Sequence, residues 1–182
     1  WVERYDLATN AWEEVAPMAE VRFYHAAAVL DGKLYAVGGY NGDDLSSVER
    51  YDPALDAWEA VAPMATARQV PGVAVLDGKL YAVGGYDGGA LSSVERYDPT
   101  TNAWEAVAPM AEARAAHAAA VLDGKLYAVG GSNDDDGHLS SVERYDPTAN
   151  AWEAVAPMAE ERWRLAVSDH GVAMLDAKLY AV

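Results

Sequence analysis

The feature that most constrains this chain is a repeat with a period of 46 to 48 residues. The sequence Val-Glu-Arg-Tyr-Asp occurs at residues 2–6, 48–52, 94–98 and 142–146. The motifs Ala-Trp-Glu, Ala-Pro-Met and Lys-Leu-Tyr-Ala-Val each recur four times in the same register. A period of this length is typical of repeat architectures, in which each unit buries apolar surface against its neighbours. The chain is therefore predicted to be an array of four repeat equivalents.

Each unit contains four short apolar segments separated by turn residues, a pattern that is typical of antiparallel strands. In the second unit these segments span roughly residues 72–76, 79–83, 93–98 and 103–107. An Asp-Gly pair at residues 77–78 joins the first two, because a two-residue hairpin needs the positive φ that glycine adopts without steric cost. The fourth copy has Asp176-Ala177 instead, so we expect its turn to be the least regular. The predicted fold class is all-β.

Composition excludes several kinds of partner and site. A net charge of −16 would repel nucleic-acid phosphates and anionic lipids, so neither is expected as a partner. The absence of cysteine rules out disulfides and thiolate metal sites and leaves the compartment open. No apolar run approaches the roughly 18 residues of a membrane span, and no leader-like segment is recognisable. We therefore expect a soluble protein without a targeting signal, cytoplasmic if it is expressed recombinantly.

A glycine doublet ends the second strand of each of the first three units, at residues 38–39, 84–85 and 130–131. A tyrosine follows about twelve residues downstream, and a tryptophan about seven residues after that. This pattern resembles the Kelch repeat, and the resemblance covers essentially the whole chain. It implies a β-propeller of four-stranded antiparallel blades, with the Ala/Val-rich strand innermost and the Trp-bearing strand outermost.

In this reading residues 1–182 form a single Kelch-like propeller domain with four blade equivalents. The domain consists of a half-blade at 1–19, complete blades at 20–65, 66–111 and 112–159, and a half-blade at 160–182. Their framework is nearly identical from copy to copy. Recent amplification or deliberate consensus construction would produce such uniformity, and we favour an engineered consensus.

The two half-blades predict how the ring closes. If the N-terminal strands pair with the C-terminal strands, they complete a fourth blade and remove two exposed sheet edges. Kelch-like proteins usually have six or seven blades, so a four-bladed ring needs a sharper rotation at each interface. Two chains that exchange half-blades would instead form eight blades. We favour closure within a monomer, because the two ends of one chain have a high effective concentration, and keep the strand-exchanged homodimer as the alternative.

The repeats differ mainly in two connections. Variation in these connections, within a nearly identical framework, indicates a function. One connection leads into the innermost strand, at residues 20–25, 66–71, 112–117 and 160–165. The other follows the glycine doublet, at residues 40–44, 86–90 and 132–138. In Kelch-like propellers both connections emerge on the face that binds partner peptides. The sequence therefore predicts a non-catalytic scaffold that binds a protein or peptide at this loop face.

The candidate binding residues lie in these connections, including the five-residue extension of the last one. Aromatic side chains and arginine beside Asn, Asp, Gly and Ser are typical of recognition surfaces. The alternative is that the aromatic side chains merely fill the mouth of the ring. The candidates are Arg22, Phe23, Tyr24, His25, Tyr40, Asn41, Arg68, Gln69, Tyr86, Asp87, Arg114, His117, Asn133, Asp135, His138, Arg162, Trp163, Arg164, Asp169 and His170.

Four of the candidate arginines recur at one register, namely Arg22, Arg68, Arg114 and Arg162. The resemblance implies that they project toward acidic partners, whose carboxylates a guanidinium can bind by paired hydrogen bonds. The alternative is that each pairs with a neighbouring Asp or Glu and braces its blade. Arg164 does not recur and is the better functional candidate.

No motif indicates catalysis, a metal or a cofactor. The acidic run at 134–136 with His138 lacks the spacing of a calcium loop, so a solvated turn is the preferred interpretation. His25 and His117 share a register but lack a third zinc ligand. The run Ser-Asp-His at 168–170 has the residue types of a nucleophile relay, but sequence neighbours seldom have the necessary geometry. A metal or catalytic site in the central channel remains the alternative function, and metal-dependent thermal stabilisation would support it.

Overall fold

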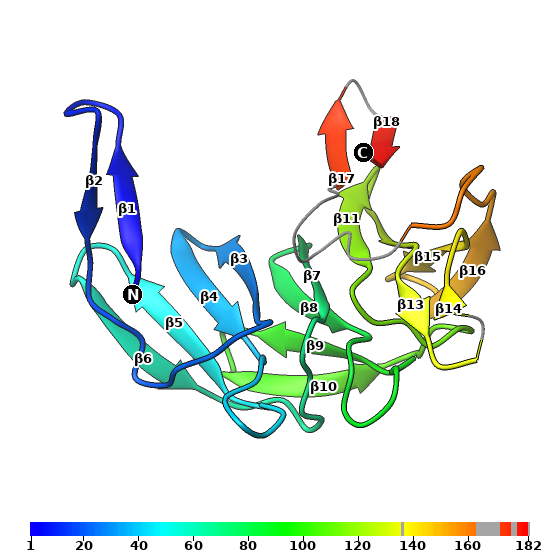
Figure 1. Cartoon of the computed structure of the whole chain (residues 1–182), viewed down its shortest axis with the longest axis horizontal. Helices are drawn as coiled ribbons and strands as arrows, with labels where there is room; N and C mark the ends of the chain where they lie inside the picture. The colour runs from blue at the N-terminus through cyan, green and yellow to red at the C-terminus, as the bar shows by residue number, and fades with distance from the viewer. Residues whose placement is uncertain (136, 163–171, 176–177, 182) are drawn as a thin grey trace.

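The structure is a computed structural model that describes residues 1–135, 137–162, 172–175 and 178–181. The described residues form strands, turns and loops without a helix, as the sequence predicted (Figure 1). Three four-stranded antiparallel sheets follow one another along the chain and are the complete blades. Their strands are β3 (Ala26–Leu30), β4 (Lys33–Val37), β5 (Val48–Asp52) and β6 (Ala57–Val61); β7 (Gly72–Leu76), β8 (Lys79–Val83), β9 (Val94–Asp98) and β10 (Ala103–Val107); and β11 (Ala118–Leu122), β12 (Lys125–Val129), β15 (Val142–Asp146) and β16 (Ala151–Val155).

The predicted hairpin turns are present in the three complete blades. In the second blade, Asp77 and Gly78 have φ of 51° and 68°, so both residues of the turn lie in the left-handed region that a type I′ hairpin requires. The strands of this blade begin and end within one residue of the predicted bounds. The turn at Asp176-Ala177, for which we predicted irregular geometry, lies outside the described residues.

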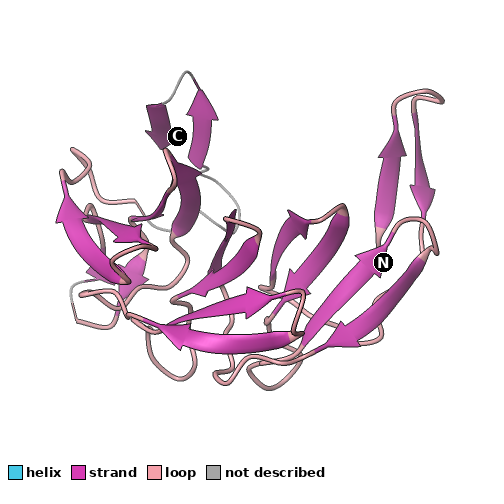
Figure 2. Cartoon of the chain, turned by 180° about the vertical axis from the view of Figure 1, so that it is seen from behind, coloured by secondary structure: helices cyan, strands magenta, loops and turns pink. Residues whose placement is uncertain are grey.

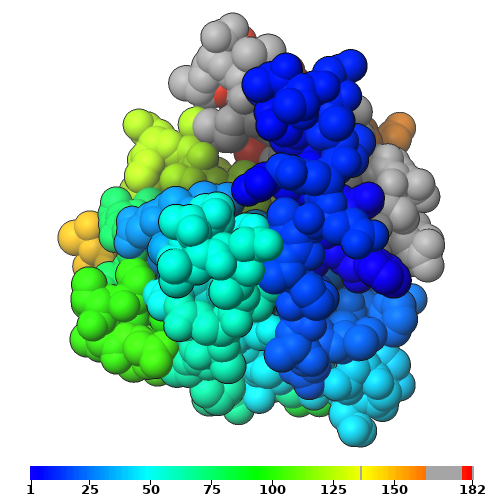
Figure 3. Space-filling model, turned by 90° about the vertical axis from the view of Figure 1, so that its left-hand side faces the viewer, coloured from blue at the N-terminus to red at the C-terminus, as the bar shows by residue number. Residues whose placement is uncertain are grey.

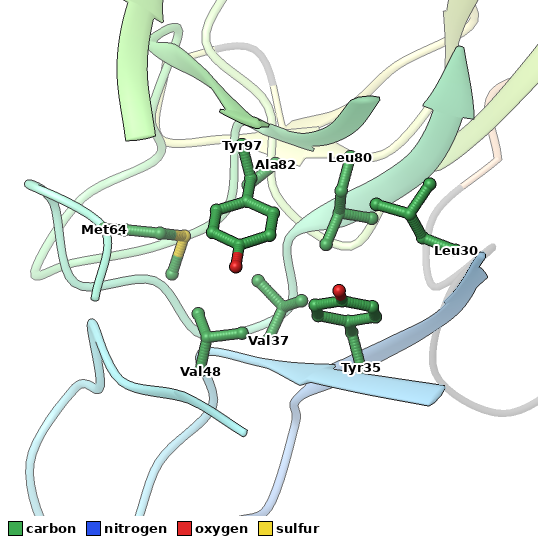
Figure 4. Close-up of a cluster of buried hydrophobic side chains, with 8 residues drawn as sticks. All are labelled: Leu30, Tyr35, Val37, Val48, Met64, Leu80, Ala82 and Tyr97. Carbon is green, nitrogen blue, oxygen red and sulfur yellow. The ribbon is translucent and has the colours of Figure 1, made fainter. Parts of the chain in front are cut away.

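The apolar core lies between adjacent blades. Between the first and second blades, Tyr35 and Val37 of β4 pack with Leu80 of β8 and Tyr97 of β9 (Figure 4). The equivalent residues of the next pair of blades form a second cluster with the same composition. Tyr35 and Tyr97 are at most 1% exposed. Each blade is therefore stabilised largely by its neighbour, which is the repeat architecture that the sequence predicted.

The terminal strands form two separate hairpins and do not complete a ring. Strands β1 (Glu3–Asp6) and β2 (Ala11–Glu14) pair with each other, as do β17 (Val172–Leu175) and β18 (Lys178–Ala181). Among the described strands, no hydrogen-bonded ladder joins β1 to β18. The two hairpins stand apart at the two ends of an open arc (Figures 1 and 2). The described strands therefore do not show the closure within one chain that the sequence led us to expect.

Candidate functional site

The two variable connections of each complete blade lie side by side. Phe23 and Tyr40 exchange both backbone hydrogen bonds, each with an N···O distance of 2.8 Å. Gln69 and Tyr86 do the same in the second blade, and Ala115 and Ser132 in the third. In the third blade the second connection also contains a short ladder of β13 (Ser132–Asn133) and β14 (Gly137–His138). The structure therefore brings together two sets of residues that are separate in the sequence.

Backbone hydrogen bonds also link these loops from blade to blade. The Val70 N–H donates to the Tyr24 carbonyl at 2.8 Å, and the Ala116 N–H donates to the Val70 carbonyl at 3.2 Å. All three residues have positive φ, with values of 54° for Tyr24, 45° for Val70 and 51° for Ala116. This conformation is unfavourable for a β-branched residue and persists only where surrounding contacts hold it. The loops therefore form one connected surface, which we call the loop face.

A pocket of about 440 Å³ opens on the loop face beside the first blade. Two aromatic side chains at its wall are well exposed, Phe23 at 61% and Tyr24 at 54%. The volume lies within the range of ordinary ligand pockets, which is about 300–1,000 Å³. The lining residues are Arg22, Phe23, Tyr24, His25, Ala26, Val70 and Pro71. Four of the predicted candidates therefore share this pocket.

Three of the four recurring arginines are buried inside the blades. Arg68 is 0% exposed, and its guanidinium donates to the Gly84 carbonyl at 2.7 Å and to the Glu95 carboxylate at 2.9 Å. Burial lowers the pKa of Arg68, although Glu95 acts in the opposite direction. Arg22 and Arg114 make the equivalent ion pairs with Glu49 and Glu143. These three arginines thus have the arrangement of the bracing alternative, and they do not project from the loop face.

The glutamates of these pairs position the connections, and the sequence analysis did not single them out. The Glu95 carboxylate accepts hydrogen bonds from the backbone N–H groups of Ala65 and Thr66, at 2.7 and 3.1 Å. It therefore anchors the start of the connection that leads to the loop face. Its signal in the sequence is a glutamate that recurs in every Val-Glu-Arg-Tyr-Asp motif.

The remaining described candidates lie on the loops outside the pocket. The exposed residues are Tyr40, Asn41, Asp87, Asp135 and His138, and the half-buried residues are Gln69, Tyr86, Asn133 and Arg162. Asn41 donates to the Glu20 carboxylate at 3.0 Å. The loops of neighbouring blades also meet here, because the Ala90 N–H donates to the Asp134 carboxylate at 2.7 Å. Trp163, Arg164, Asp169 and His170 lie outside the described residues.

His117 occupies the register of His25, but the two side chains have different environments. His117 is fully buried, and neither ring nitrogen has a hydrogen-bond partner among the described residues, whereas His25 is exposed. The imidazole fills the space that a side chain at Gly72 would need, since a Cβ there would lie 2.6 Å from the His117 Nε2. Burial, together with the nearby Arg114 and Arg68, lowers the pKa of His117 to about 3.

This buried histidine predicts a loss of stability in acid. The pKa of the folded state lies below the ordinary value of 6.5, so the unfolded chain binds more protons once the pH falls below 6.5. Between pH 7 and pH 5 we expect His117 to lower the free energy of unfolding by about 2 kcal/mol. Urea denaturation of the wild type and of His117→Ala at both pH values measures this difference. His25→Ala is the matched control, because it removes an exposed histidine at the same register. Equal pH dependence in all three proteins would contradict the prediction.

The described part of the chain contains no group of three His, Cys, Asp or Glu residues arranged to hold a metal ion. Within the same residues, no helix has the length and apolarity that a membrane span requires. The candidate binding site is the loop face, with its aromatic pocket and its acidic loops.

Comparison with known proteins agrees with this architecture. The KLHDC2/KLHL20/DRC7 Kelch-repeats domain matches residues 5–182. Kelch-like protein 21 of Bos taurus is 56% identical over 36 residues, which is 20% of this chain and 6% of that protein. Kelch-like protein 1 of Mus musculus is 48% identical over 42 residues (23% of this chain, 6% of that protein), and Kelch-like protein 7 of Homo sapiens is 48% identical over 40 residues (22% and 7%). The chain thus spans only a small part of the length of these relatives.

The family match covers nearly all of the chain, and the four-stranded sheets, glycine doublets and spaced Tyr and Trp residues lie where that architecture requires them. The chain therefore belongs to the Kelch-repeat family.

Proposed function

We propose that this chain is a non-catalytic scaffold that binds a protein or peptide at its loop face. Kelch-repeat domains generally act as protein-binding scaffolds. The observation that carries the proposal is the pair of exposed aromatic residues, Phe23 and Tyr24, in a pocket at the face where the repeats vary. Exposed aromatic side chains beside a pocket are typical anchors of protein interfaces.

The charge of the loops favours a basic partner. The guanidiniums of Arg22, Arg68 and Arg114 are buried, whereas several carboxylates lie on the loops. They belong to Asp43, Asp44, Asp87, Asp134 and Asp135. Burial and the neighbouring Asp87 raise the pKa of Asp44, and a bound cationic group would relieve this repulsion. The partner that fits best is a segment with an apolar or aromatic residue for the pocket and with lysine or arginine beside it.

Selection from a random peptide library displayed on phage tests the proposal. We expect the wild-type chain to enrich peptides with an aromatic or apolar residue flanked by Lys or Arg. Both Phe23→Ala and Tyr24→Ala should weaken binding of an enriched peptide by at least about tenfold, because each removes an exposed aromatic anchor. The second variant should fold, since Ala116 already occupies the register of Tyr24 with φ of 51°.

Leu55→Ala is the control for this experiment, because Leu55 is 74% exposed but lies in the turn between β5 and β6. It should bind the enriched peptide like the wild type. Failure to enrich any peptide would contradict the proposal, as would equal losses in all three variants.

Two further proposals concern the origin and the ends of the chain. The near identity of the repeats supports an engineered consensus origin. The two terminal hairpins are proposed to be complementary halves of a blade, because β1 and β2 carry the third-strand and fourth-strand motifs of the repeat and β17 and β18 occupy the positions of its first and second strands.

A further inference from the structure

Asn41 is the only asparagine of the chain that is followed by a glycine. It lies in the loop between β4 and β5, which projects from the end of the first blade, and this part of the chain is at the surface (Figures 1 and 3). Asn41 is exposed, and no atom lies within 4 Å of the position that a Cβ at Gly42 would occupy. Asp87 and Gly88 have the same surroundings at these registers of the second blade, so the open turn is a property of the repeat.

The Asn41 side chain folds back over its own turn. Its Nδ2 donates to the Glu20 carboxylate at 3.0 Å, and its Oδ1 accepts from the Asp43 N–H at 3.4 Å. An amide oxygen that accepts from the N–H two residues ahead lies above the peptide group in between, which here contains the Gly42 nitrogen. Among the described residues the Gly42 N–H has no hydrogen-bond partner, so it can lose its proton to the solvent.

This arrangement favours ring closure between the Asn41 side chain and the next peptide nitrogen. The deprotonated Gly42 nitrogen forms a bond to the Asn41 Cγ, the bond from Cγ to Nδ2 breaks, and ammonia leaves with the proton. The Asp43 N–H donates to the oxygen that becomes negatively charged during the attack, and such a donor stabilises that charge. Water then opens the cyclic imide at either of its carbonyl groups, which gives aspartate or isoaspartate. In sum, an amide and water become a carboxylate and ammonium.

The other asparagines do not combine these features. The Asn102 Oδ1 accepts from the Ala62 N–H at 3.0 Å and from the Tyr97 hydroxyl at 2.9 Å, and Asn150 makes the equivalent bonds one blade further on. Asn133 is half-buried in the ladder of β13. In each case the next residue has a side chain that hinders its nitrogen, since Asn10, Asn102 and Asn150 precede alanine and Asn133 precedes aspartate.

We propose that Asn41 is a site of spontaneous modification, at which the Gly42 nitrogen converts the side-chain amide into a carboxylate through a cyclic imide. The reaction needs only water and adds a negative charge to the loop face. It does not depend on what binds there.

The second blade shows where a carboxylate at this register is tolerated. There Asp87 takes the place of Asn41, and Thr66 takes the place of Glu20. In the first blade Glu20 remains, and a carboxylate at residue 41 would replace the 3.0 Å hydrogen bond with a contact between like charges. The conversion of Asn41 therefore loosens a link between the two variable connections of the first blade.

Incubation of the purified chain at mildly alkaline pH in water enriched in oxygen-18 tests the proposal. We expect peptide mapping by mass spectrometry to show deamidation at Asn41 at least about tenfold faster than at Asn102, Asn133 or Asn150, because glycine leaves the attacking nitrogen unhindered. Both aspartate and isoaspartate should appear, and both should carry oxygen-18, since water opens the ring. Asn41→Gln is the control, because its longer side chain must close a larger ring, and residue 41 should then stay unmodified over the same period.

Two results of this experiment would overturn the proposal. One is a rate at Asn41 no higher than the rates at the other asparagines. The other is aspartate without isoaspartate, because direct hydrolysis of the amide gives aspartate alone.

The effect on the loop face is tested by a double-mutant cycle. Asn41→Asp should lower the melting temperature by about 2 °C in the wild-type background, because the new carboxylate faces Glu20. In the Glu20→Thr background, which reproduces the arrangement of the second blade, the same substitution should leave the melting temperature unchanged. Equal shifts in the two backgrounds would show that repulsion by Glu20 is not the consequence of the modification.

Discussion

Replacement of Arg68 by alanine is expected to lower the free energy of unfolding by about 3–5 kcal/mol, which is the typical cost of removing one partner of a buried ion pair. Arg68 is 0% exposed, and its loss would leave the Glu95 carboxylate and the Gly84 carbonyl without their donor. The backbone N–H groups of Ala65 and Thr66, which donate hydrogen bonds to Glu95, would then lose a well-positioned acceptor. Urea denaturation at pH 7, followed by tryptophan fluorescence, measures the change.

The matched control for Arg68 is Arg96→Ala. Arg96 pairs with Glu105 across two strands of the same blade, but the two side chains are 27% and 58% exposed. Exposed ion pairs contribute about 0–1 kcal/mol, so this variant should lose no more than that. Similar losses in the two variants would show that burial does not decide the role of the recurring arginines.

Gly84→Ala is expected to lower the free energy of unfolding by about 3 kcal/mol or more, since backbone strain adds to overpacking. Gly84 has φ of +54°, and a Cβ at this position would lie 2.4 Å from the Arg114 carbonyl oxygen and 2.9 Å from the His117 ring. A backbone oxygen cannot move away as the end of a flexible side chain can. The substitution should therefore push the second and third blades apart at the loop face, and thermal and urea denaturation would both detect it.

Gly88→Ala separates the cost of backbone strain from the cost of steric overlap. Gly88 has a similar φ of +70°, but no atom lies within 4 Å of the Cβ position. Only strain should remain, with a loss of about 1 kcal/mol. If Gly84→Ala is no more harmful than Gly88→Ala, the close approach of the blades at the glycine doublet is not what requires glycine there.

Much of the fold was predictable because its signals are local. The strands β7 to β10 lie where apolar segments and turn residues placed them, and Asp77-Gly78 forms its turn from φ preferences alone. In the first blade, the paired backbone hydrogen bonds between Phe23 and Tyr40 show that the two variable connections are in contact. The choice between the two roles of Arg68 was not predictable, because spacing along a chain does not say whether a long side chain turns inward or outward.

By itself, the sequence determined the all-β class, the repeated unit, its strands and hairpins, and the loops in which the repeats differ, since these follow from periodicity and from the conformations of Gly, Pro and Asp-Gly pairs. Only the tertiary structure decided what depends on contacts between units. Arg22, Arg68 and Arg114 are buried against the glutamates of the Val-Glu-Arg-Tyr-Asp motifs. His117 is buried, whereas His25 at the same register is exposed. The terminal hairpins also remain apart. The physical reason is that burial and pairing depend on which neighbouring blade is present and at what rotation, and identical local sequences do not carry that information.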